Sequence, residues 1–305
     1  MTNVAREQVP AAGELSLDHV AHFVPHVEAA SASLEKLGFT ATPFSAHSHR
    51  LEPGGPLTPA GAGNVCVMLE RGYLEIVTPT ADTPLATQLR TAIRRHVGVH
   101  MIAFGTAAPE ADHARLEKAG YAPLPPVALQ REIGTVNGTG LVRFTVVRTA
   151  PGSMPEGRIQ FCLHHTPELL WQARWIEHAN RATGLTAVIL CVEDPQEAAQ
   201  RYARYTGLLA QRSGSVWRLT TARGCLLFID EKTLLRRLDL APPALPWIAG
   251  YVLESADIDA TGDYLRRCDA GVRLLGGRRL LVNLPAALGG IVVFEPQRAS
   301  VLDFN

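Results

Sequence analysis

LSLDHVAHFVP, residues 15–25, is the stretch that decides the fold, because the chain repeats its design further along. Residues 97–106 read VGVHMIAFGT and form a second apolar, strand-like stretch. Each is followed by a helix-period segment that ends in glycine and an aromatic residue, at 34–39 (LEKLGF) and 116–121 (LEKAGY). Glycine is typical of the residue that ends a helix. The chain therefore contains an internal repeat, which is the first feature to interpret.

Two further copies occupy the second half. The third opens at 184–194 (GLTAVILCVED) with a helix that stops at Gly207, and the fourth opens at 248–257 (IAGYVLESAD) with a helix that ends near Gly271. Every copy closes with a strand that follows a glycine: 72–75 (GYLE), 157–160 (GRIQ), 224–227 (GCLL) and 290–293 (GIVV). The unit is strand, helix and three strands. It predicts an α+β fold of four βαβββ modules paired into two domains.

The repeat also divides the chain. We expect a first domain over 15–167, from modules 15–80 and 97–167, and a second over 184–297, from modules 184–230 and 246–297. Residues 1–14 and 298–305 are expected to be terminal tails. The connector 168–183 (ELLWQARWIEHANRAT) is expected to pack between the domains, with Trp171 and Trp175 on one helical face.

The composition indicates an ordinary globular protein. Of 305 residues 47% are hydrophobic and 19% charged, and 29 basic side chains balance 29 acidic ones. This balance predicts no general attraction to nucleic acid or an anionic membrane, and the apolar run 185–192 is too short to span a bilayer. Five cysteines without a Cys-x-x-Cys pair indicate buried thiols in a reducing compartment. Since the N-terminus lacks an apolar signal segment, the expected location is cytoplasmic.

Four polar side chains recur at matching positions of the first two copies. Superimposing the opening strands puts His19 on His100, and superimposing the closing strands puts Glu75 on Gln160. If the two modules pair about a pseudo-twofold axis, the four converge on a concave sheet. Imidazoles suit Fe, Zn, Ni or Cu, and oxygen ligands also admit Mn or Mg. A lone strand histidine is more often structural, but the matched pairs favour a divalent metal site.

The second domain lacks such a set. All eleven histidines lie at or before His178, and the four equivalent positions of copies three and four hold apolar residues: Ala187, Leu227, Gly250 and Val293. None of these side chains can bind a metal. A structural or dimer-forming role is therefore expected for this domain, with binding of a small hydrophobic ligand left open.

Other polar residues are candidates for substrate contact. His164 shares the strand parity of Gln160, so it is expected to face the pocket, whereas His165 faces away. Both also suit a structural role at a helix entry. Asn64 follows Gly61-Ala62-Gly63 and either orients substrate or makes the turn.

A Ser/His/Pro/Gly-rich segment, 45–63, is expected to be a solvated loop, or else a cover for the site. It carries His47 and His49. Arg131 and Arg143 are further candidates, as partners of an anion, although surface arginines are plentiful.

On these residues the chain resembles the vicinal oxygen chelate superfamily, which includes glyoxalase I, extradiol ring-cleaving dioxygenases and bleomycin- and fosfomycin-resistance proteins. Segments 70–75 (ERGYLE) and 164–171 (HHTPELLW) resemble its bacterial glyoxalase-like domain proteins. In that family the opening and closing strands of paired modules supply the metal ligands. The resemblance therefore implies a ligand set of His19, Glu75, His100 and Gln160, in which glutamine replaces the commoner second carboxylate.

The resemblance implies a metal-dependent enzyme for a small oxygen-bearing substrate, of lyase or isomerase type. Its ion would be Zn, Ni, Mn or Fe(II), with Glu75 as ligand and general base. If Gln160 does not bind, two histidines and a carboxylate remain, as in Fe(II)-dependent extradiol-type dioxygenases. A metal-free binding or drug-sequestering protein is a third alternative. The expected partner is a small molecule, not nucleic acid or membrane, and a homodimer is possible.

Overall fold

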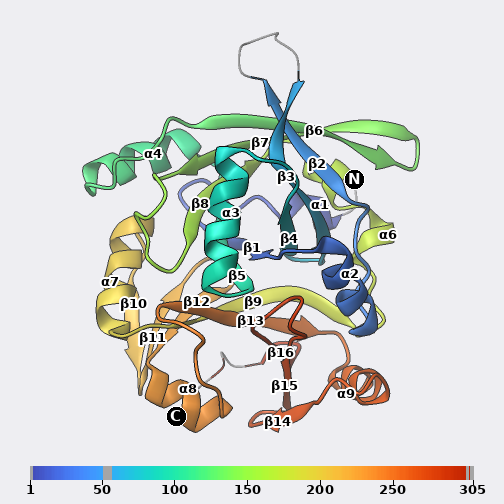
Figure 1. Ribbon diagram of the computed structural model, residues 1–305. Helices are drawn as coiled ribbons and strands as arrows, with labels where there is room; N and C mark the ends of the chain where they lie inside the picture. The colour runs from blue at the N-terminus through green and yellow to red at the C-terminus, as the bar shows by residue number, and fades with distance from the viewer. Residues whose placement is uncertain (1–2, 51–56, 300–301, 303–305) are drawn as a thin grey trace.

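The computed structural model describes residues 3–50, 57–299 and 302. In this part of the chain, four βαβββ units join into one 16-stranded sheet (Figure 1). The first unit comprises β1 (Ser16–Phe23), α2 (Val27–Lys36), β2 (Ser45–Arg50), β3 (Leu57–Met68) and β4 (Tyr73–Pro79). The second comprises β5 (Gly98–Gly105), α4 (Pro109–Lys118), β6 (Val127–Thr135), β7 (Gly138–Arg148) and β8 (Arg158–His164).

The second half repeats this order. Its third unit comprises β9 (Ala182–Cys191), α7 (Pro195–Thr206), β10 (Ala210–Ser213), β11 (Val216–Thr220) and β12 (Cys225–Ile229). Its fourth comprises β13 (Trp247–Ser255), α9 (Ile258–Arg267), β14 (Arg273–Leu275), β15 (Arg279–Asn283) and β16 (Ile291–Pro296). Further helices are α1 (Asn3–Arg6), α3 (Pro84–Arg95), α5 (Pro167–Leu170), α6 (Ala173–Ile176) and α8 (Glu231–Leu238). The predicted fold of paired βαβββ modules is confirmed.

The units pair within the chain. β1 runs antiparallel to β5, and each is flanked by the parallel closing strand of its own unit, β4 or β8. β9 and β13 pair in the same way, flanked by β12 and β16. The two halves meet where Ile248 of β13 lies opposite Val99 of β5, and one hydrophobic core runs through both.

A close approach explains the glycine before each closing strand. A Cβ on Gly72 would lie 2.6 Å from the carbonyl oxygen of Asp18, and one on Gly157 would lie 2.3 Å from that of His100. Real Cβ atoms do not approach backbone so closely, so these positions require glycine. The two contacts also identify Asp18 and His100 as equivalent residues of the two units.

The register corrects the sequence superposition by one residue. His19 lies opposite Tyr73, whereas Met101 lies opposite Arg158, the residue equivalent to Tyr73. Met101 is therefore the counterpart of His19, and superimposing His19 on His100 was wrong. The spacing to the helix ends supports the correction: segments 34–39 and 116–121 stand 82 residues apart, as do His19 and Met101, whereas His19 and His100 stand 81 apart.

Two segments differ from their expected conformation. Residues 45–50 and 57–63 belong to β2 and β3, a paired ribbon instead of a solvated loop, and 51–56 lie outside the described residues. Trp171 and Trp175 do not share one helix, because the chain leaves α5 at Trp171 and α6 begins afterwards. The Trp171 indole, 2% exposed, donates from Nε1 to the carbonyl of Leu69 at 3.0 Å, which favours the break.

The terminal segment and the cysteines complete the fold. α1 packs against the α5 region, and the buried Gln8 amide donates to the carbonyls of Val4 and Glu70.

All five cysteines are free thiols, and Cys268 is the one that is not fully buried. Within the described residues, no helix combines the length and apolarity needed to cross a membrane.

The two halves are also joined by a buried ion pair, which generates the first prediction. Arg201 of α7 makes two 2.8 Å hydrogen bonds to Glu156, a side chain that is 1% exposed. Arg201→Ala leaves this carboxylate buried and unpaired, so the free energy of unfolding should fall by about 3–5 kcal/mol in urea titrations. Adding Glu156→Gln should recover part of the loss.

Arg266→Ala is the matched control. Its pair with Asp263 is 61% and 62% exposed, so the change should stay below about 1 kcal/mol. Equal effects of the two arginine substitutions would show that Glu156 does not depend on Arg201.

Candidate functional site

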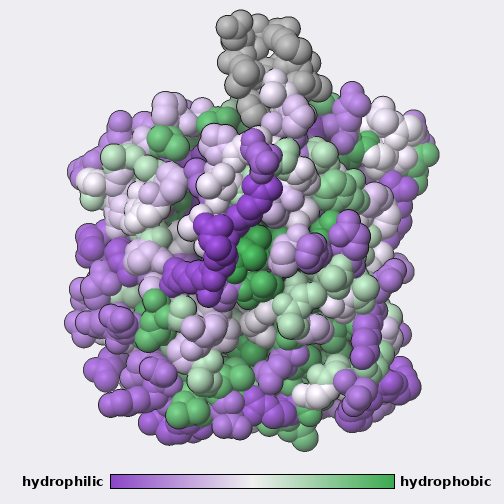
Figure 2. Space-filling model, viewed as in Figure 1, coloured by the Kyte–Doolittle hydropathy of each residue, from purple (hydrophilic) through white to green (hydrophobic). Residues whose placement is uncertain are grey.

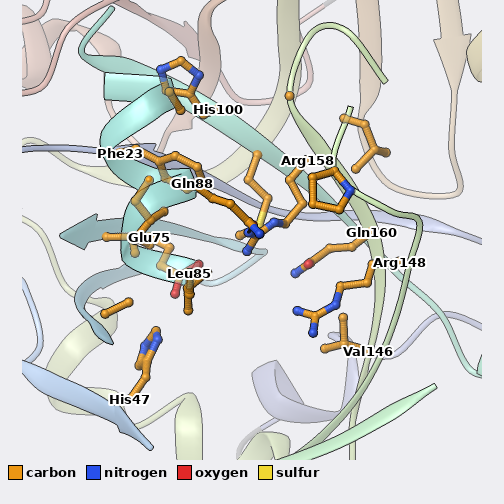
Figure 3. A pocket seen from close by; sticks show the side chains of 18 of the residues that line it. Phe23, His47, Glu75, Leu85, Gln88, His100, Val146, Arg148, Arg158 and Gln160 are labelled. Carbon is orange, nitrogen blue, oxygen red and sulfur yellow. Dashed lines mark hydrogen bonds between the residues drawn. The ribbon is translucent and has the colours of Figure 1, made fainter. Parts of the chain in front are cut away.

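A cavity of about 1000 Å³ occupies the concave side of the first half. It is walled by β1, β4, β5 and β8, by the β6–β7 ribbon and by one side of α3 (Figures 1 and 3). Figure 2 shows hydrophilic residues on the outer surface over α3, with hydrophobic residues visible beside it. The volume matches a site for a molecule of many atoms.

Small side chains stand on the strands next to the two predicted closing-strand ligands. Ala21 of β1 pairs with Glu75, and Ala103 of β5 pairs with Gln160. The equivalent positions in the second half hold Ile189 and Val252, which belong to an apolar cluster completed by α8. The same sheet geometry therefore gives a cavity of about 1000 Å³ in one half, and in the other an apolar cluster beside a pocket of about 230 Å³.

His19 is held by a buried carboxylate. Its Nδ1 donates to Oδ2 of Asp18 at 2.7 Å, and its ring stacks on Tyr73 at 4.3 Å between centroids. Its Nε2 lies 3.8 Å from Oε2 of Glu75 and 3.5 Å from the Tyr73 hydroxyl. Burial raises the pKa of Tyr73 well above its usual range, so this hydroxyl stays protonated. The structure brings His19 and Glu75 together with Nε2 facing the cavity.

Glu75 is oriented by a chain of donors. Asn64 donates from its amide to Oε1 of Glu75, and Arg131 donates to the amide oxygen of Asn64 at 2.8 Å. His47 also lines the cavity, and burial lowers the pKa of its imidazole. Asn64 lies within strand β3, so the alternative that it makes a turn is wrong, and its side chain lies beside Glu75.

Gln160 and His100 lie on other parts of the wall. Figure 3 shows Gln160 facing the cavity beside Arg148, and His100 at one end of the view. The His100 ring stacks on His96 at 4.0 Å and donates from Nε2 to the His96 carbonyl at 2.8 Å. Burial, with the nearby His96, lowers the pKa of His100 to about 3. His100 is therefore neutral, with Nδ1 as its free ligand nitrogen.

His164 and His165 lie away from the cavity wall. His164 is 4% exposed and donates from Nε2 to Asp18 at 3.0 Å, beneath the Tyr73 and Trp171 rings. His165 is on the outside, with Nε2 2.8 Å from the Thr145 hydroxyl. Strand parity alone could not predict this, because the rings of Tyr73, Phe144 and Trp171 pack around the His164 imidazole.

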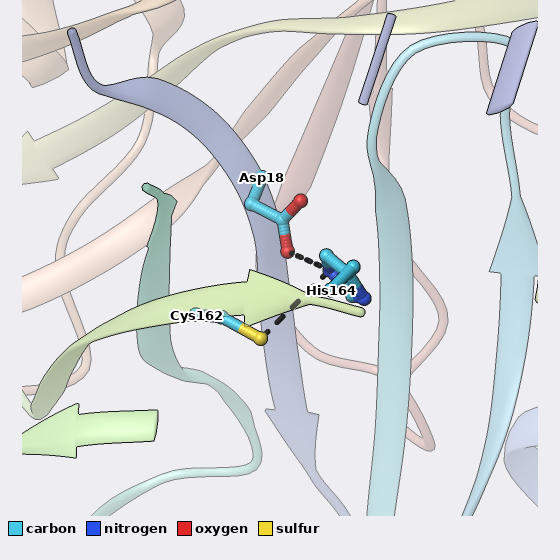
Figure 4. Close-up of side chains that lie close together, drawn as sticks. All are labelled: Asp18, Cys162 and His164. Carbon is cyan, nitrogen blue, oxygen red and sulfur yellow. Dashed lines mark hydrogen bonds and ion pairs between the residues drawn. The ribbon is translucent and has the colours of Figure 1, made fainter. Parts of the chain in front are cut away.

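Asp18, Cys162 and His164 form a buried cluster (Figure 4) whose candidate ligand atoms all lie within 4.8 Å of one another. Burial would by itself raise the pKa of Asp18, but His164 and His19 hold it well below its usual range. Burial would lower the pKa of His164, yet Cys162 and Asp18 raise it well above normal. Because burial also raises the pKa of Cys162, Asp18 is the stable charge. The cluster is thus a carboxylate–imidazolium pair beside a thiol.

Sequence reasoning missed Asp18, Tyr73, Arg148 and Arg158. Asp18 precedes a predicted ligand, and its acidic type in an apolar strand was the available signal. The others occupy alternate positions of the closing strands or pair with them, so strand register is what brings them to the cavity.

The donor set partly fits a divalent ion. Two atoms 3.8 Å apart, such as Nε2 of His19 and Oε2 of Glu75, can each lie about 2.0–2.2 Å from one ion. The bond from Asp18 to the other nitrogen of His19 is the arrangement that orients metal-binding imidazoles. Gln160 adds an amide oxygen on the facing closing strand, whereas Met101 replaces a second histidine.

A family model described as a glyoxalase-like domain matches residues 17–206. No curated protein matches the chain. A mutant of 4-hydroxymandelate synthase from Streptomyces coelicolor has 14% sequence identity and a TM-score of 0.54, with 95% of each chain covered.

Two other solved structures cover 95% of this chain. A catechol 2,3-dioxygenase has 13% identity, a TM-score of 0.58 and 90% of its own chain covered. A Mn(II)-bound glyoxalase from Novosphingobium aromaticivorans has 12% identity, a TM-score of 0.52 and 84% covered. At such identities the likeness shows the fold alone.

The buried carboxylate generates the second prediction. Asp18→Asn keeps the size of the side chain but leaves the His164 imidazolium without its counter-charge, so unfolding should cost about 3 kcal/mol less in urea. The titration is made with a chelator present, because a bound metal would add its own stabilisation. Asp263→Asn, at an exposed pair, is the control. A wild-type midpoint for Asp18→Asn would contradict the charged pair.

Proposed function

Because the chain belongs to the glyoxalase-like domain family of the vicinal oxygen chelate superfamily, we propose that it is a metal-dependent enzyme of lyase or isomerase type, acting on a small oxygen-bearing substrate. The observation that carries the proposal is the position of Glu75. Its carboxylate is fixed by Asn64 on one oxygen and lies 3.8 Å from His19 on the other, inside a large cavity.

We propose His19, Glu75 and Gln160 as the residues that hold the ion, with His100 as the fourth. His19 offers Nε2, Glu75 offers Oε2, and Gln160 offers its amide oxygen from the equivalent closing strand. His100 would offer Nδ1 from the neighbouring bulge while keeping its bond to the His96 carbonyl. Such a set suits Zn, Ni, Mn or Fe(II).

The chemistry proposed is a proton transfer next to a carbonyl group. When bound, the ion would polarise the substrate oxygen and make the neighbouring C–H more acidic. Once released from the ion, Oε2 of Glu75 would take that proton and return it to the adjacent carbon, while the substrate's hydroxyl proton passes to the former carbonyl oxygen, so no oxidant is required. Asn64 and Arg131 hold Oε1 in place during the transfer. The Tyr73 hydroxyl is a neutral hydrogen-bond partner beside His19.

Fe(II)-dependent dioxygenation is the second candidate. Its support is the ligand set itself, because His19, His100 and Glu75 would form two histidines and a carboxylate if Gln160 stays unbound. A third candidate is metal-free binding of a small molecule, which the size and apolar walls of the cavity favour.

Metal content gives the third prediction. Protein purified without an affinity tag should carry about one divalent ion per chain by plasma mass spectrometry. His19→Ala and Glu75→Ala should lose it, while Gln160→Ala and His100→Ala should bind about 10-fold more weakly or worse. His165→Ala is the control, because its imidazole lies outside the cavity.

Cys162→Ser and His164→Ala distinguish the two candidate centres. Both should retain the ion, because these side chains belong to the buried cluster beside Asp18. Loss of metal from these variants and not from His19→Ala would move the site to that cluster. Absence of metal from every sample, even after reconstitution with each ion, would favour the binding protein.

Proton exchange gives the fourth prediction. Carbonyl compounds with a neighbouring hydroxyl or oxo group are incubated with the metal-loaded protein in D₂O, and loss of the C–H signal is followed by NMR. Glu75→Gln should slow exchange about 10²- to 10⁴-fold, because an amide cannot accept the proton. Asn64→Ala should have a smaller effect. Oxygen uptake without exchange would instead support dioxygenation.

A further inference from the structure

The cavity wall carries an excess of positive charge. Among its described lining residues are four arginines and one carboxylate, that of Glu75: the arginines are Arg95, Arg131, Arg148 and Arg158. Most of the remaining wall is apolar, so it offers little to offset this charge. Uncompensated positive charge in a cavity with low-dielectric walls favours an anionic ligand.

Two of the four arginines already have strong partners. Arg95 donates to the carbonyl oxygens of Pro155, at 3.1 Å, and Pro246. Arg131 donates to the side chain of Asn64 at 2.8 Å. Both guanidinium groups therefore serve the protein's own structure.

The other two arginines are available to a ligand. Within the described residues, Arg148 has no hydrogen-bond or ion-pair partner for its guanidinium, and Arg158 makes one 3.3 Å bond, to Gln88. Guanidinium groups with few partners of their own can donate charge-assisted hydrogen bonds to an anion bound between them.

Strand register brings this pair close to the proposed ion. Arg148 of β7 lies directly opposite Gln160 of β8, and Arg158 precedes Gln160 by two residues on the same strand face. Figure 3 shows Arg148 and Gln160 pointing into the cavity, with Arg158 nearby and Glu75 on the other wall. An anionic group held here would lie beside Gln160. The atoms of the ligand next to that group would then extend toward Glu75.

The apolar wall defines the rest of the ligand. Phe23, Leu85 and Val146 line the cavity with other apolar side chains, in a volume of about 1000 Å³. Such a volume accommodates drug-sized molecules and far exceeds the size of a three-carbon compound. The shape therefore suits an acid with a hydrophobic body.

We propose that the substrate is an organic carboxylic acid whose carboxylate binds between Arg148 and Arg158 and whose aromatic or aliphatic body packs against Phe23, Leu85 and Val146. The assignment of this acid as substrate rests on the proposed function, since the reacting oxygen is the one near Gln160 and Glu75. The arginine pair is then the specificity determinant of the cavity.

The test is a calorimetric titration with 4-phenylbutyrate and with its uncharged amide. The acid should bind at least about 10-fold more tightly than the amide, because a carboxylate receives charge-assisted hydrogen bonds from both arginines. Arg148→Gln and Arg158→Gln should each weaken binding of the acid by about 10-fold to 100-fold and leave that of the amide nearly unchanged. Lysine at either position should restore part of the affinity.

Arg143→Gln is the matched control, an exposed arginine on the same strand that does not line the cavity. It should bind the acid as the wild type does. Thermal melting of each variant checks that the fold is retained. Equal affinity for acid and amide, or equal loss in Arg143→Gln, would overturn the inference.

Metal content is measured on the same samples. Preference for the acid in protein that takes up no metal, even after reconstitution, would refute the proposed enzyme and leave the carboxylate site standing. Metal uptake without preference for the acid would refute the carboxylate site and leave the proposed enzyme standing.

Discussion

The site depends on a constraint in the backbone. In each unit a glycine before the closing strand lies against the carbonyl oxygen of a bulged residue in the opening strand. Gly72 lies against Asp18 and Gly157 against His100, at distances that no Cβ tolerates. The contact fixes the register of each closing strand. Glu75 therefore lies opposite Ala21 on the neighbouring strand, and its counterpart Gln160 lies opposite Ala103. A register slip of one residue would turn every inward side chain outward.

The same constraint recurs in the second half with a different outcome. Gly224 approaches the carbonyl of Thr186 and Gly290 that of Ala249, so the backbone geometry is repeated. There Leu227 and the inward residues beside it are large and apolar, and with α8 they form an apolar cluster that leaves only a small pocket. Function is thus decided by which side chains stand at a few fixed positions of a repeated sheet.

The residues fixed by these glycine contacts also show how much of the fold and the site could be predicted from the sequence. The glycines that end each helix and precede each closing strand predicted the modules and the closing-strand residues, because a glycine in a turn can be recognised from the sequence around it. Superimposing His19 on His100 was an error that the sequence could have prevented, because the helix ends 34–39 and 116–121 have the same spacing as His19 and Met101. The strands at 45–50 and 57–63 escaped prediction because glycines and prolines indicate a loop, whereas pairing with the rest of the sheet makes them strands.

Opposite charges line the two sides of the cavity. On one wall Asp18 fixes His19, and Glu75 adds a second carboxylate within 3.8 Å of the same imidazole. On the other wall the bulky cations Arg148 and Arg158 stand along β7 and β8. A cation is drawn to the first side and an anion to the second, so a ligand of mixed character can bind in one orientation only. Because both sets stand on paired strands of one rigid sheet, the separation between them is fixed before any ligand enters, and binding energy is not spent on arranging the groups.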